Sequence, residues 1–85
     1  MASVLDRQLN KLESIVEKFC IAGKEDDAYE CVEWARGYAD DFPQEADIQE
    51  AIEQVKQVGK YLTAEGKPQY EKVREALEKE LRNLL

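Results

Sequence analysis

Apolar side chains recur every three or four residues over most of the chain, the spacing of one face of an α-helix. No stretch alternates apolar and polar residues with the period of two that marks a half-buried strand. The first helical stretch runs from about Ser3 to Ile21. Its apolar face comprises Leu5, Leu9, Leu12, Ile15, Val16 and Phe19. Ser3 followed by Asp6 resembles an N-terminal capping box, and Gly23 suits the left-handed residue after a helix end.

A second helix is predicted from about Asp26 to Asp41, with acidic residues in its first turn, where the helix dipole favours negative charge. Its apolar face comprises Ala28, Cys31, Val32, Ala35, Tyr38, Ala39 and Phe42. Pro43 ends this helix, and the residue before a proline favours extended backbone, so we expect Phe42 to be extended.

Two more helices follow, from about Glu45 to Ala64 and from Pro68, a favoured first-turn residue, to about Asn83. The face of the third comprises Ile48, Ala51, Ile52, Val55, Val58 and Leu62, and that of the fourth Tyr70, Val73, Leu77, Leu81 and Leu84. Because the connections are short, consecutive helices should be antiparallel neighbours.

The pattern predicts an all-α fold in which residues 1–85 form one domain of four antiparallel helices. Either a closed bundle or two stacked helical hairpins fits the spacing. A chain of 85 residues buries roughly 60–65% of its unfolded surface, so its core is small. There is room for one apolar layer and none for a deep substrate cavity.

Charge is distributed unevenly along the chain. Residues 25–53 carry eleven acidic residues and a single basic one, Arg36, a local net charge of −10. The remaining residues sum to +3, which gives the chain its net charge of −7. A chain this acidic is a poor match for nucleic acid or anionic lipid, because phosphate contacts require Lys and Arg.

Several locations and chemistries are disfavoured by the sequence. No apolar run is long enough to span a membrane, and residues 1–7 lack the basic and then apolar pattern of a secretory signal, so we expect a cytoplasmic protein. The chain has no histidine, no glycine-rich phosphate loop and no calcium-loop motif, so we expect neither an enzyme nor a cofactor or metal site. An acyl carrier protein of this size would need Asp-Ser-Leu at its second helix, and Glu13-Ser14-Ile15 lies in the first.

The two cysteines, Cys20 and Cys31, fall on neighbouring helices near one turn. Their offset of about four residues, ~6 Å of helical rise, adds to the separation of the helix axes. A disulfide is awkward over that span, so we expect both thiols to be reduced and at least partly buried.

The acidic block also holds exposed aromatic residues, and together they form the candidate binding face. Trp34 lies well off the centre of its apolar face, and Tyr38 follows one turn later on the same side. Aromatic side chains flanked by carboxylates often anchor protein contacts. The candidate partner-binding residues are Trp34, Tyr38, Glu30, Glu33, Asp40 and Asp41. A solvated acidic face with aromatics closing the ends of a thin core is the competing interpretation.

Residues 12–43 resemble a tetratricopeptide hairpin. Gly23 is followed by Ala28 and Ala35, at the family spacing of five and twelve residues, and large apolar residues precede it. Pro43 comes three residues later than the family proline, and Val16 replaces a small residue. The resemblance implies a helical scaffold that binds peptides or proteins.

These observations favour a non-enzymatic protein–protein interaction module, such as an adaptor, a chaperone-like subunit or a small inhibitor, whose partner has a basic surface. Two alternatives stay open. One is an acidic regulator that sequesters a basic nucleic-acid-binding protein by mimicking phosphate. The other is a structural bundle that associates with itself, for instance as a homodimer.

Overall fold

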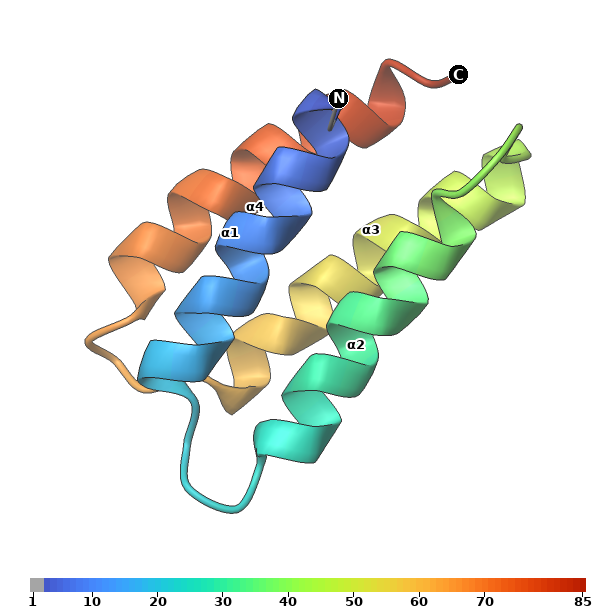
Figure 1. Ribbon diagram of the computed structural model, residues 1–85. Coiled ribbons are helices and arrows are strands. Elements are labelled where there is room, and N and C mark those ends of the chain that lie inside the picture. The colour runs from blue at the N-terminus through green and yellow to red at the C-terminus, as the bar shows by residue number, and fades with distance from the viewer. Residues whose placement is uncertain (1–2) are drawn as a thin grey trace.

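The computed structural model describes residues 3–85, which fold into four α-helices that run alternately up and down (Figure 1). They are α1 (Val4–Phe19), α2 (Glu25–Tyr38), α3 (Glu45–Val58) and α4 (Lys67–Arg82), with a 3₁₀ turn, η1 (Gly59–Tyr61), after α3. Each helix contacts both of its neighbours, including α1 with α4, so the bundle is closed. The predicted all-α fold of four antiparallel helices is confirmed, and the closed bundle is the form it takes.

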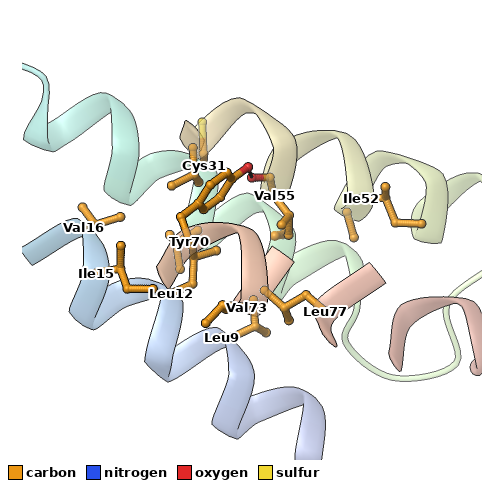
Figure 2. Packing of buried hydrophobic residues seen from close by; sticks show 14 of the residues in the cluster. Leu9, Leu12, Ile15, Val16, Cys31, Ile52, Val55, Tyr70, Val73 and Leu77 are labelled. Atoms are coloured by element: carbon orange, nitrogen blue, oxygen red, sulfur yellow. Dashed lines mark hydrogen bonds between the residues drawn. The ribbon is translucent and has the colours of Figure 1, made fainter. Parts of the chain in front are cut away.

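The core is built from the apolar faces that the sequence pattern predicts. Side chains from all four helices meet along the bundle axis (Figure 2). No charged residue within 3–85 is buried there. Leu12, Val32, Ile48, Val55 and Leu77 are inaccessible to solvent or nearly so. Since apolar burial is the main favourable term in folding, this one layer supplies most of the stability of the domain.

Tyr70 of α4 carries a hydroxyl group into the core. Its ring lies among the apolar residues, and its hydroxyl donates to the Val55 carbonyl at 2.7 Å (Figure 2). That carbonyl lies in the last turn of α3, where the Gly59 amide donates to the carbonyls of Lys56 and Gln57 instead. Burial raises the pKa of the Tyr70 hydroxyl to about 12.

The connections before α2 and before α4 lie at the same end of the bundle and are joined by backbone hydrogen bonds. The Ile21 amide donates to the Tyr61 carbonyl and the Thr63 amide to the Phe19 carbonyl, each at 2.8 Å. These bonds form a single antiparallel bridge between Cys20 and Leu62. They end α1 at Phe19 and the α3–η1 segment at Tyr61, earlier than the predicted ends at Ile21 and Ala64.

The connection between α2 and α3 departs most from prediction. The second helix ends at Tyr38 rather than Asp41, and Phe42 adopts φ +50° rather than an extended conformation. Because the chain has left the helix, Phe42 is 93% exposed and is not part of the core, contrary to prediction. Leu84 was also wrongly predicted to face inward: it lies beyond the end of α4 and is half-exposed.

Candidate functional site

Trp34 and Tyr38 lie one turn apart on the outer side of α2. Their ring centroids are 5.9 Å apart, with a tilt of 32° between the ring planes, a separation typical of favourable aromatic pairs. Tyr38 is half-buried against the core, whereas Trp34 is 50% exposed. Tyr38 therefore covers the edge of the core, and half of the Trp34 indole surface is left in water.

Glu30 lies one turn before Trp34 and fixes the position of the indole. The Trp34 Nε1–H donates to Glu30 Oε1 at 3.2 Å. Glu30, Trp34 and Tyr38 therefore form one row of i, i+4 neighbours along α2, held by a hydrogen bond at one step and ring contact at the next. A side chain held in this way loses less conformational freedom on binding than a free one.

A shallow hollow of about 370 Å³ lies against this row. It is lined by Glu30, Glu33, Trp34, Gly37 and Tyr38, which we call the Trp34 face. Gly37 has no side chain to fill the space, and a Cβ placed there would meet no atom within 4 Å. The sequence analysis did not select Gly37, although a glycine one turn after an exposed tryptophan, inside a helix, is a readable signal.

The remaining candidates lie beside the Trp34 face. Asp40 lines a neighbouring hollow that shares Glu33 and Gly37 with it and extends towards α1. Asp41 is exposed in the α2–α3 connection and lines neither hollow. The structure thus places Glu30, Glu33, Trp34 and Tyr38 together, Asp40 next to them, and Asp41 apart.

The one cation of the acidic block turns away from the Trp34 face. The Arg36 guanidinium lies 3.3 Å from Glu13 of α1 and also donates to the side chain of Asn10. Its Nε is 4.0 Å from Glu33. Within residues 3–85, no other carboxylate of the block has a basic group within 4.0 Å, so the field around the Trp34 face is negative.

Neither cysteine has the environment of a nucleophile. Both are free thiols, Cys31 buried and Cys20 half-buried, as the sequence analysis expected. Burial raises the pKa of each, and the nearby Asp27 carboxylate raises it further. Since the thiolate is the reactive form, raised pKa values favour inert thiols.

No protein-family model, curated protein or solved structure matches the chain. Among residues 3–85, no helix has the length and apolar character needed to cross a bilayer. The same residues hold no cluster of three side chains suited to bind a metal ion. The Trp34 face itself offers an aromatic surface, a hollow and two carboxylates.

Proposed function

We propose that the protein is a non-enzymatic cytoplasmic protein–protein interaction module whose Trp34 face docks on a basic surface of a protein partner. The role would be that of an adaptor, a chaperone-like subunit or a small inhibitor. The observation that carries this proposal is the half-exposed indole, held by Glu30 and Tyr38 beside a hollow that Gly37 leaves open.

The energetics of binding support this use of Trp34. Tryptophan and tyrosine are enriched among the few interface residues that carry most of the binding energy. Removing the remaining exposed indole surface from water is favourable by roughly 25 cal/mol per Å². The hydrogen bond to Glu30 sets the orientation of the ring before a partner arrives, so less ordering is left for the binding step.

The carboxylates define the kind of partner. Glu33 and Glu30 border the hollow, with Asp40 beside it and Asp41 in the turn beyond. Opposite charges across an interface speed encounter and exclude wrong partners, and both effects weaken with salt. A partner that presents Lys or Arg around an apolar patch is complementary to this arrangement. The tetratricopeptide-like pattern over residues 12–43 stays a prediction consistent with it.

Affinity capture from the source cells, with the whole chain as bait and mass spectrometry as readout, tests the proposal. We expect a partner that is retained by the wild type and lost with Trp34→Ala or with Glu30→Lys combined with Glu33→Lys. Two matched controls should retain it: Leu84→Ala, which removes a similarly exposed apolar side chain at the far end of α4, and Glu50→Lys on α3.

The same experiment separates the proposal from phosphate mimicry and from an inert surface. If the captured protein binds nucleic acid and DNA displaces it, the phosphate-mimicry alternative is correct instead. If every captured protein survives both Trp34→Ala and the double Glu→Lys change, the Trp34 face is an ordinary solvated surface and the proposal is wrong.

A further inference from the structure

A second open groove lies between α1 and α4. Its floor is apolar, formed by Ile15 and Val73, and its rim carries three lysines, Lys11 and Lys18 of α1 and Lys72 of α4. We call these five residues the lysine groove. Its volume, about 370 Å³, equals that of the hollow at the Trp34 face.

The lysines of this groove form no ion pair within residues 3–85. No carboxylate of residues 3–85 lies within 4.0 Å of any of their ammonium groups. The five ion pairs within residues 3–85 all involve arginine, not lysine. In a chain of net charge −7, three unpaired ammonium groups around an apolar floor form a local surface of opposite sign.

The lysine groove and the Trp34 face are complementary. One presents an apolar floor with three positive charges, and the other presents an aromatic pair with two carboxylates in its lining. A lysine ammonium over an indole is also attracted by the ring quadrupole, and its methylene stem covers apolar surface. The Trp34 face lies on α2, whereas the lysine groove lies between α1 and α4, which are neighbours in the bundle (Figure 1).

We propose that the partner of the Trp34 face is a second copy of this chain, bound through the lysine groove between its α1 and α4. This inference rests on the proposed function, because it names the basic surface that the Trp34 face recognises. The contact joins two different surfaces, so a pair held by one contact still has one free groove, on the first copy, and one free face, on the second. Single contacts of this kind build head-to-tail rings or filaments, whereas a two-fold dimer would have to form both contacts at once.

A second copy fits better than an unrelated basic protein for a reason visible in the chain itself. Both surfaces are present at equal concentration in every solution of the protein, and each supplies the charge and the apolar area that the other lacks. The hollows are small, so the contact should be weak, steered by charge and sensitive to salt.

The decisive experiment mixes two variants that each lack one surface. Trp34→Ala removes the face and keeps the groove, whereas Lys11→Glu with Lys18→Glu and Lys72→Glu removes the groove and keeps the face. The mass of the intact chain is measured by sedimentation equilibrium across protein concentrations, at about 0.01 M and about 1 M salt, where the Debye lengths are ~30 and ~3 Å.

At low salt we expect the wild type to grow in mass with concentration beyond two chains, and each variant alone to remain a monomer. Mixed together, the two variants should form a 1:1 pair and nothing larger, because the pair has one intact contact and no free complementary surfaces. At high salt the wild-type association should weaken.

The control for charge is a second triple variant, Lys56→Glu with Lys60→Glu and Lys67→Glu. These three lysines line a second basic hollow, beside Tyr70 and Arg74, so the variant changes the net charge by the same amount and removes the other basic surface of similar size. It should still associate if the lysine groove is the docking site. Circular dichroism checks that all variants keep their helices. Glu30→Lys with Glu33→Lys serves as a second face variant if Trp34→Ala is not helical.

Three results would overturn the inference. They are a wild type that stays monomeric at every concentration, an equimolar mixture that does not pair, and a groove variant that still dimerises by itself. The first leaves the proposed function standing if a different protein is captured through Trp34. If no protein, this chain included, binds in a way that depends on Trp34, both the inference and the proposed function are wrong.

Discussion

Gly37 best distinguishes the two interpretations of the Trp34 face, a binding surface and an ordinary solvated surface. Glycine inside a helix costs up to about 1 kcal/mol relative to alanine, because it loses more backbone freedom on folding. At Gly37 no neighbouring atom would oppose a methyl group. Packing in the isolated chain therefore does not explain the glycine, whereas an occupant of the hollow would.

We predict that Gly37→Ala raises the free energy of unfolding by about 0.5–1 kcal/mol. The same methyl narrows the hollow and weakens whatever binds there. Urea unfolding measures the first effect, and partner capture or sedimentation measures the second. If stability rises while association is unaffected, the hollow is not occupied and the Trp34 face is a solvated surface.

Tyr70 should make the stability of the protein depend on pH in the alkaline range. Its pKa is raised from 10.0 to about 12 by burial, so the folded chain keeps the proton while the unfolded chain loses it. The folded form is thus fully favoured below pH ~10, and its stability falls as the pH rises from there towards ~12. Two pKa units correspond to roughly 2.7 kcal/mol.

Tyr70→Phe isolates this contribution. At neutral pH the variant should lose about 1–2 kcal/mol, because the Val55 carbonyl loses the hydroxyl that bonds to it. Between pH 10 and 12 its stability should fall less steeply than that of the wild type. Urea titrations at a series of pH values measure both effects, and parallel pH profiles for the two proteins would contradict the assigned role.

At the scale of the elements, the apolar spacing was sufficient to predict four helices and almost all of the core. Their ends were predicted less well, because tertiary contacts decide them. The backbone hydrogen bonds from Ile21 to Tyr61 and from Thr63 to Phe19 join two connections about forty residues apart. No local sequence pattern predicts such a bond. Phe42 was misplaced for a related reason, since the helical spacing was extended past the end of α2.

The two glycines at the bends near this bridge look equivalent in the sequence and have different roles. Gly23 needs its positive φ of 89° and has open space around it. Gly66 has an ordinary backbone conformation, but a Cβ there would lie 2.4 Å from the Cβ of Phe19. One is required by backbone conformation and the other by the close approach of α4 to α1.

Alanine substitutions should therefore differ in cause and in size. Gly23→Ala should cost about 1–2 kcal/mol through the strained backbone alone. Gly66→Ala should cost about 1–3 kcal/mol, because Phe19 must move away and the packing of α4 on α1 loosens. Hydrogen exchange would distinguish them: only Gly66→Ala should increase exchange at the start of α4. Equal, local effects from both changes would contradict the packing argument.

In the whole molecule, the acidic block and the candidate site overlap on α2. The sequence placed the negative charge on the second and third helices, and the structure brings Glu30, Glu33, Trp34 and Tyr38 of α2 to one surface. The hollow itself was beyond prediction, because it depends on how the side chains of α2 arrange themselves around Gly37. The lysine groove was also missed, since its residues lie about sixty positions apart in the sequence.

The unpaired carboxylates should make the free protein less stable than its core alone would allow. Arg36 pairs with Glu13 and lies 4.0 Å from Glu33, and no other basic group within residues 3–85 approaches the acidic block within 4.0 Å. Like charges one turn apart on a helix are mutually destabilising by about 0.2–0.5 kcal/mol per pair. Salt screens that repulsion, so the free energy of unfolding in urea should increase from about 0.01 M to about 1 M salt.

Charge reversal turns this instability into a test of function. Glu30→Lys with Glu33→Lys relieves the repulsion between Glu30 and the acidic first turn of α2 and should raise the free energy of unfolding, although it removes the Glu30 hydrogen bond to Trp34 and the exposed 4.0 Å contact between Glu33 and Arg36. Glu50→Lys should raise it on α3 in the same way. If the Trp34 face binds a partner, only the double variant on α2 should lose association. The α2 variant would then gain stability and lose binding, whereas Glu50→Lys would gain stability and keep binding. If both variants gain stability and neither loses binding, the acidic block serves solubility rather than recognition.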